Sequence, residues 1–195
     1  PGALSPTSPP CNPRLITTGT LVLTNDNNSF TGPIYLATGT VVVTSIGDEG
    51  EVSAAGAGLT AGDGVDFRLG FGNSTGTLSY TGTGDETDRQ IQIGVSNGNS
   101  ADDTAQAASS RIEHNGANGG TGLVWSSANF NIADSNANGL VRARTLSLGG
   151  SNTDANEIQG IIGDNNGTDS GSGVTDNTVS VGKDGIGTWV LSGAN

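Results

Sequence analysis

The sequence predicts an all-β solenoid in which short strands stack in parallel from one coil to the next. Three observations lead to this fold class. The apolar residues come in short bursts bounded by Gly, Asn or Thr, as expected for short strands between tight turns. Similar short sequence motifs built around Gly-Thr-Leu-Val, here called phrases, recur along the chain. The 33 glycines are spread so evenly that no stretch keeps apolar residues at helical spacing.

The apolar bursts give the predicted strands in chain order. They are Leu21–Leu23, Val41–Val43, Ile91–Ile93, Leu123–Trp125, Leu146–Leu148 and Trp189–Leu191. A solenoid interior is narrow, so we expect one apolar residue of each burst to be largely buried. These residues are Leu21, Val41, Ile93, Val124, Leu146 and Val190. The alternative architecture is an antiparallel β-sandwich, which usually has a larger aromatic core than the eight aromatic residues of this chain provide.

The spacing of the recurring phrases predicts the length of a coil. Successive phrases begin at Thr18, Thr38, Thr75, Thr121, Arg144 and Gly187, which lie 20, 37, 46, 23 and 43 residues apart. These distances are close to one or two times about 20 residues, a length that suits one turn of a parallel β-helix. We therefore expect each coil to contain about 20 residues.

A longer repeat frames the chain. The phrase that begins at Gly19 begins again at Gly187, which gives a period of 168 residues. Residues 1–14 contain five of the six prolines and are expected to form an extended lead-in, because proline cannot donate to a sheet. The predicted organisation is this lead-in followed by a solenoid over residues 15–195, about one 168-residue repeat plus the start of the next. Repeat units of this kind stack on their neighbours.

The charge and the cysteine content exclude several classes of protein. The formal net charge is −12 with only seven Lys and Arg, which argues against binding to nucleic acid or to an anionic membrane. No apolar run approaches the ~20 residues of a membrane span. The single cysteine, Cys11, excludes an internal disulfide framework and leaves a free thiol or an intermolecular bridge.

Two stretches resemble a known family. Gly19-Thr-Leu-Val-Leu-Thr24, with Phe30-Thr-Gly32 after it, is similar to the autotransporter-associated β-strand repeat, and Gly187-Thr-Trp-Val-Leu-Ser-Gly-Ala-Asn195 matches the first half of that motif. Asn25 stands where the family usually has Gly. The resemblance implies a right-handed parallel β-helix in an extracellular or cell-surface protein with a structural or adhesive role. It implies no chemistry.

Residues that could carry catalysis are few. His114 is the only histidine, and a catalytic base would need a nucleophile and an orienting carboxylate nearby. We expect His114 to face a turn or to cap a coil instead. Carboxylates occur together at Asp85, Glu86 and Asp88 and at Asp102 and Asp103, where turn chemistry already explains them. The prediction is that the chain is not an enzyme.

One segment suggests a metal. Gly62-Asp-Gly-Val-Asp-Phe-Arg-Leu69 resembles a single unit of the nonapeptide calcium repeat. Such sites need stacked successive units, and the chain has one copy. Calcium is therefore a hypothesis with Asp63 and Asp66 as candidate ligands, and no other cofactor is expected.

The predicted function is a secreted, extracellular structural protein that builds a surface fibre, filament or stalk. An uncapped solenoid end has unpaired backbone groups that can pair with further strands, so we expect copies of the chain to associate head to tail. The candidate self-assembly residues are Leu21, Val22, Leu23, Trp189, Val190 and Leu191. The alternatives are an adhesin or glycan-binding module and, third, a polysaccharide-active enzyme. Trp125 and Trp189 lie in strand bursts, which favours core positions over an exposed sugar-binding face.

Overall fold

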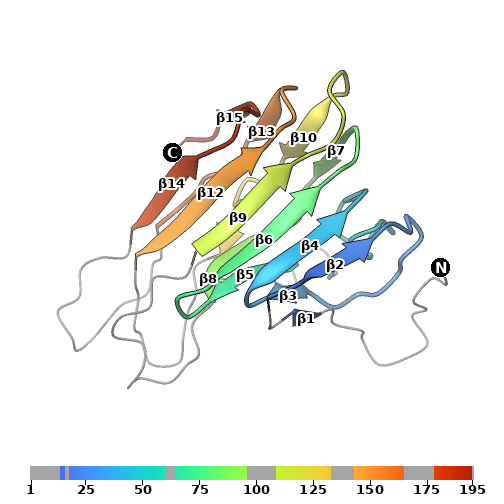
Figure 1. Cartoon of the computed structure of the whole chain (residues 1–195), viewed down its shortest axis with the longest axis horizontal. Coiled ribbons are helices and arrows are strands. Elements are labelled where there is room, and N and C mark those ends of the chain that lie inside the picture. The colour runs from blue at the N-terminus through green and yellow to red at the C-terminus, as the bar shows by residue number, and fades with distance from the viewer. Residues whose placement is uncertain are drawn as a thin grey trace.

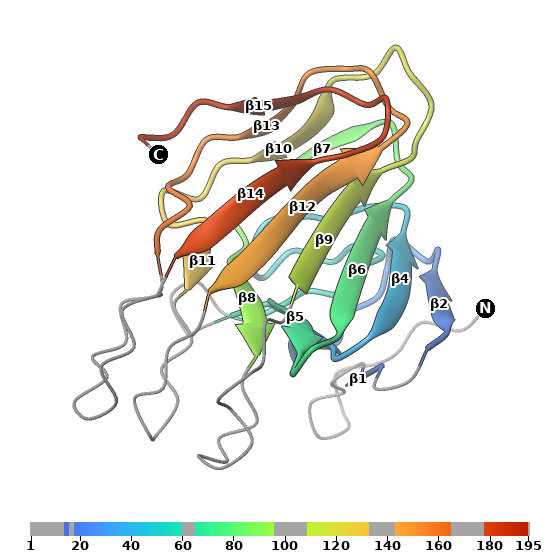
Figure 2. The same cartoon turned by 60° about the vertical axis from the view of Figure 1, so that its left-hand side comes forward.

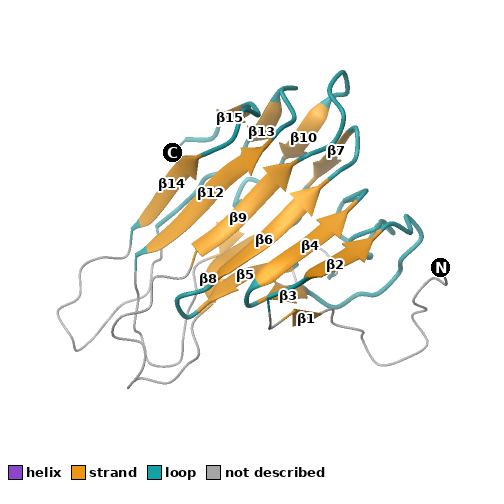
Figure 3. Ribbon diagram, in the orientation of Figure 1, coloured by secondary structure: helices purple, strands orange, loops and turns teal. Residues whose placement is uncertain are grey.

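The computed structural model of the chain describes residues 14–15, 18–59, 65–95, 109–132, 143–164 and 178–194. In these residues the regular structure consists of strands joined by turns (Figure 3). No helix in the described part has the length and apolar character needed to cross a bilayer. The predicted lead-in, residues 1–14 with Cys11, lies outside the described residues except for Arg14, which begins the first strand.

The strands form three sheets. The first sheet contains β1 (Arg14–Leu15), β3 (Ile34–Leu36), β5 (Phe67–Phe71), β8 (Ile91–Val95) and β11 (Asn131–Ile132). The second contains β2 (Thr20–Leu23), β4 (Gly39–Val43), β6 (Thr75–Tyr80), β9 (Ser109–His114), β12 (Arg144–Gly150) and β14 (Val179–Lys183). The third contains β7 (Gly84–Thr87), β10 (Gly122–Trp125), β13 (Asn156–Ile158) and β15 (Trp189–Leu191).

From β5 to β13 each coil takes one strand from each sheet in turn, whereas the coils of β1–β2 and β3–β4 have no strand in the four-stranded sheet. The chain runs through β5, β6 and β7, then β8, β9 and β10, then β11, β12 and β13, and every named strand pairs in parallel with the equivalent strand of the next coil. Figures 1 and 2 show the six-stranded sheet running from β2 to β14, with the other two sheets behind it. The fold is therefore an all-β parallel solenoid, as the sequence predicted, and the antiparallel sandwich is wrong.

The predicted coil length was wrong for most of the molecule. In the six-stranded sheet the step between register partners is 20 residues from Leu21 to Val41, but 34–37 residues at every later step. The phrase at Thr75 forms β6, whereas the phrase at Thr121 leads into β10 of the four-stranded sheet. The 23-residue spacing between Thr121 and Arg144 therefore measures the path from β10 to β12 in another sheet. The 20-residue spacing joins β2 to β4, a short coil that has no strand in the four-stranded sheet.

The 168-residue period also connects strands of two different sheets. The phrase at Gly19 leads into β2 of the six-stranded sheet, whereas the phrase at Gly187 leads into β15 of the four-stranded sheet. Two similar sequences thus occupy different sides of the solenoid.

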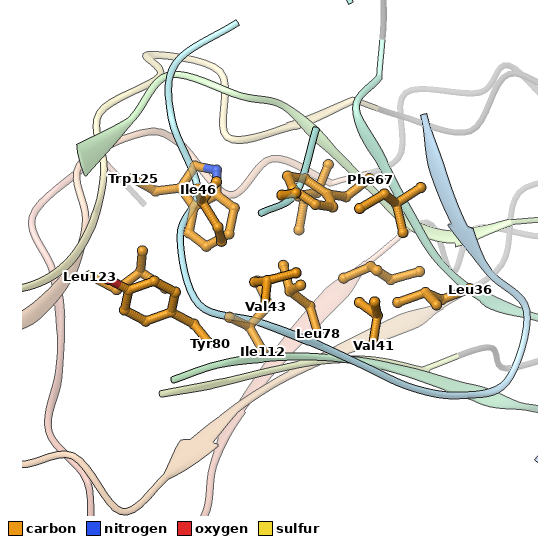
Figure 4. Close-up of a cluster of buried hydrophobic side chains, with 14 of the residues drawn as sticks. Leu36, Val41, Val43, Ile46, Phe67, Leu78, Tyr80, Ile112, Leu123 and Trp125 are labelled. Carbon is orange, nitrogen blue, oxygen red and sulfur yellow. The ribbon is translucent and has the colours of Figure 1, made fainter. Parts of the chain in front are cut away.

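A continuous apolar core fills the space between the sheets (Figure 4). Val41, Ile93 and Leu146 are at most 1% exposed, as predicted, and Leu21 is partly buried against the core. Val124 is only partly buried, because β10 turns its neighbours Leu123 and Trp125 inward, and both are 0% exposed.

The prediction that Val190 is largely buried was also wrong. It is 41% exposed, because it follows the outward column of Val124 and Glu157 in the register of the four-stranded sheet. Trp125 is a core residue, as predicted. Its ring lies edge-on to Phe67 and Phe130, with centroids 6.2 and 5.4 Å away.

Candidate functional site

The last described coil presents two strand edges. β14 ends the six-stranded sheet and β15 ends the four-stranded sheet. Within the described residues neither strand has a partner on its outer side, so both carry a row of backbone donors and acceptors that can accept a further strand. Figure 2 shows both strands in the last coil, at one end of the molecule.

The apolar core opens at this end. In the register of the six-stranded sheet Val181 follows Leu146, and in that of the four-stranded sheet Leu191 follows Ile158. Register partners in a sheet point to the same side. Leu146 and Ile158 are 0% exposed, whereas Val181 and Leu191 are 42% and 41% exposed. Two inward columns of the core therefore end in apolar side chains that nothing in the described residues covers.

Trp189 completes this end of the core. It follows Leu123 and Asn156 in an inward column and packs against the core while partly exposed. Its indole Nε1 donates to the main-chain oxygen of Gly149 at 2.9 Å, which ties β15 to the end of β12. We call Val181, Lys183, Trp189 and Leu191 the stacking face.

The candidate self-assembly residues occupy opposite ends of the solenoid. Leu21 and Leu23 pack partly buried against the core in β2, and Val22 is 57% exposed on the outer side of the same strand. Trp189 and Leu191 belong to the stacking face, whereas Val190 points outward. The structure does not bring the two groups together within one chain, because β2 lies at the edge of the six-stranded sheet opposite β14, and β15 belongs to the same coil as β14.

A groove lies on the side of the solenoid near β7. It has a volume of about 380 Å³. Its lining residues are Asp26, Ser45, Ile46, Gly47, Glu51, Val52, Ser53, Asp85 and Glu86. Asp85 accepts a hydrogen bond from the backbone N–H of Ile46 at 2.8 Å. Burial raises the pKa of Asp85, while the bonds from Ile46 and Tyr80 lower it.

The segment beside the groove is held by an arginine that the sequence analysis did not identify. Arg89 is 1% exposed, and its guanidinium donates to the main-chain oxygens of Asp48, Glu51, Ala55 and Gly56 at 2.7–3.4 Å. Burial lowers the pKa of Arg89, and the nearby carboxylates oppose this shift. No local pattern marks Arg89, since its acceptors lie 33–41 residues earlier in the chain.

His114 has a structural position inside the core. It is 0% exposed, and its Nε2 and Nδ1 face the main-chain oxygen of Gly82 at 3.0 Å and the side-chain oxygen of Asn156 at 2.5 Å. Tyr80 lies against the ring, with centroids 4.7 Å apart. His114 thus contacts the turn between β6 and β7 from a buried position. The histidine connects three coils through groups that are not nucleophiles.

The calcium candidates do not form a recognisable site in the described residues. Asp63 lies outside them. Asp66 is 2% exposed, its Oδ1 accepts from the backbone N–H of Leu59 at 2.8 Å, and its Oδ2 has no hydrogen-bond partner there. Within the same residues no group of three His, Cys, Asp or Glu side chains is placed to hold a metal ion.

The chain is similar to part of a much longer protein. It is 32% identical over 171 residues, 88% of this chain, to a protein of Brucella suis biovar 1 (strain 1330) described as "Adhesin BmaC autotransporter". The match spans only 4% of that protein's length. No protein-family model matches the chain. No solved structure matches it. The chain is thus an all-β parallel solenoid similar to a short part of an autotransporter adhesin.

Proposed function

We propose that the chain is a non-catalytic structural segment of an extracellular or cell-surface adhesin, and that its solenoid units stack end to end to build a stalk or fibre. The similarity to an autotransporter adhesin supports the location and the adhesive context. The parallel solenoid and the Gly-Thr-Leu-Val phrases together support membership of the autotransporter-associated β-strand repeat family.

One observation carries the stacking proposal: the core columns end in exposed Val181 and Leu191. Covering apolar side chains is favourable by about 25 cal/mol per Å² of surface removed from water. The same contact would give the free edge of β14 a partner strand. In a head-to-tail arrangement β2 of a second copy would add in parallel to β14, so the six-stranded sheet would continue. Such a heterologous contact does not close and gives a linear array.

Contacts between coils would make each unit stiff along its axis. Asn156 accepts from the backbone N–H of Leu123 at 2.8 Å in the preceding coil and donates to the main-chain oxygen of Thr188 at 2.9 Å in the following coil. Asp154 accepts from the backbone N–H groups of Gly119 and Gly120 at 2.9–3.0 Å. These bonds join successive coils without using the strand edges, as a load-carrying stalk requires.

The lateral groove favours a second candidate function, recognition of a glycan. Its carboxylates, the Ser45 and Ser53 hydroxyls and the Val52 side chain offer the mixture of polar and apolar groups found in ligand sites. The groove has no aromatic residue in its lining, so a sugar would be held by hydrogen bonds and aliphatic contacts and would have no ring to stack on. The stalk remains the proposal that the core columns favour.

A tandem protein tests the stacking. Two copies joined head to tail through residues 1–13 should unfold in one cooperative transition at a higher temperature than one copy, and X-ray scattering should give a rod twice as long. Val181→Asp in the first copy should abolish both effects, whereas Ser180→Asp, on the outer side of the same strand, should keep them. Two units that unfold at the temperature of the single copy and move independently would contradict the proposal.

A further inference from the structure

The stacking face contains one charged residue in an inward column. Lys183 follows Leu148 in the register of the six-stranded sheet. Leu148 is 2% exposed and belongs to the core, whereas Lys183 is exposed. It is also the only lysine of the chain. The column that carries Val41, Leu78 and Ile112 through the core therefore ends in an ammonium group.

The ammonium is held next to the turn that follows β14. Its Nζ donates to the main-chain oxygens of Asp184 and Gly185, both at 2.9 Å. An ammonium group is a donor with no acceptor capacity. In the exposed end coil, water can hydrate the ammonium group of Lys183. A further coil stacked on this end would remove that water.

A second copy stacked on this face would bring apolar residues to Lys183. The inward residues of β2 are Leu21 and Leu23, in register with Val41 and Val43. Parallel addition of β2 to β14 would set one of these leucines against the lysine. Removing a charged group from water without an opposite charge costs several kcal/mol. Inward-pointing charges are one means by which proteins prevent unwanted addition to sheet edges.

We propose that Lys183 controls the stacking of a second copy on this face: its charge keeps free copies apart, and neutralising it permits head-to-tail association. The inference rests on the proposed function and adds a regulating residue to it. Val181 and Leu191 favour contact, and Lys183 opposes it. Units held in one chain would overcome this opposition, because tethering raises the effective concentration of the second unit to the millimolar range.

Self-association of two matched variants tests the proposal. Lys183→Leu removes the charge in the inward column, and Ser180→Leu adds the same side chain to the outer side of β14, where Ser180 is in register with Thr145. By sedimentation equilibrium the K183L variant should associate at least about tenfold more tightly than the native chain, a difference of 1.4 kcal/mol. The S180L variant should behave like the native chain. Equal association of native and K183L chains, or of the two variants, would overturn the proposal.

Chemical acetylation of the native chain gives a second measurement, because it neutralises Lys183 without an amino-acid substitution. An amine-directed acetylating reagent can modify only Lys183 and the chain's α-amino group. The acetylated native chain should associate as K183L does. A Lys183→Arg variant keeps its charge and should stay dissociated after the same treatment, which controls for the α-amino group. Association of treated K183R, or none in the acetylated native chain, would contradict the role of Lys183.

The outcomes separate this inference from the proposed function. If the tandem protein stacks but neither K183L nor the acetylated chain associates, the stacking stands and the control by Lys183 is wrong. If the native chain already associates as strongly as K183L, the stacking gains support and the control by Lys183 is again wrong. If K183L associates while the tandem units stay independent, the contact exists between free copies and the proposed stalk is wrong.

Discussion

Arg111 on β9 binds Asp184, two coils further along the chain, by crossing the outer side of β12. Its Nη2 donates to Asp184 Oδ1 at 2.6 Å, its Nη1 pairs with Oδ2, and its Nε pairs with Glu113. These contacts raise the pKa of Arg111, with the bond to Asp184 as the largest cause. The bridge fastens the turn that follows Lys183 to the body of the solenoid.

Gly149 leaves the space that this bridge needs. A Cβ on Gly149 would lie 2.5 Å from Asp184 Oδ1 and 2.8 Å from Arg111 Nη2. We predict that Gly149→Ala displaces the pair and speeds hydrogen exchange in residues 179–191, with a loss of stability of about 1 kcal/mol or less, since the pair is partly exposed. Gly182→Ala is the control, because its Cβ would meet only Ser147 Oγ at 3.9 Å. Equal exchange in both variants would contradict the prediction.

The strand positions were predictable where the core is made of aliphatic residues. Val41–Val43, Ile91–Ile93 and Leu146–Leu148 all lie in strands of the structure. β9 was missed because its inward positions include Ser110 and His114, which are 0% exposed. Their partners come from other coils, and a single sequence does not reveal such distant hydrogen bonds.

The ends of the solenoid were only partly predictable. The sequence identified β2 and β15 as candidate assembly strands, but it could not assign them to different sheets. It also missed β14, whose Val181 continues an inward column. The residue that a side chain follows in the next coil depends on the coil length. The coil length could not be obtained from the recurring phrases, because some lie in the six-stranded sheet and others in the four-stranded sheet.

Asn156 is expected to be essential to the polar part of the core. It is 0% exposed and bonds to Leu123, His114 and Thr188. Asn156→Leu would leave the buried backbone N–H of Leu123 and the buried His114 ring without this partner, at about 1–3 kcal/mol for each group. We predict a loss of at least about 2 kcal/mol in urea unfolding. Asn118→Leu, which removes one exposed bond to Thr153, should cost less than about 1 kcal/mol. Similar losses would show that the buried network is not important.

Arg89 is expected to hold the segment at residues 45–58. Arg89→Lys keeps the charge but cannot reach all the main-chain oxygens that the planar guanidinium binds. We predict a loss of at least about 2 kcal/mol, from buried acceptors left without donors, and faster proteolysis within this segment. Arg68→Lys is the control, because Arg68 is exposed in β5. Proteolysis at the native rate in R89K would contradict the assigned role.

Asp85 is expected to make stability depend on pH. Burial raises its pKa in the folded chain, so between the ordinary aspartate pKa of about 3.9 and the raised value the folded state binds more protons than the unfolded state. Stability therefore falls as pH rises through this window. Asp85→Asn removes the titration, so the melting temperature of D85N relative to the native chain should rise with pH across the window. Glu86→Gln removes a charge from the same groove and is the control. A difference between D85N and the native chain that stays constant with pH would show that the half-buried carboxyl of Asp85 does not carry the effect.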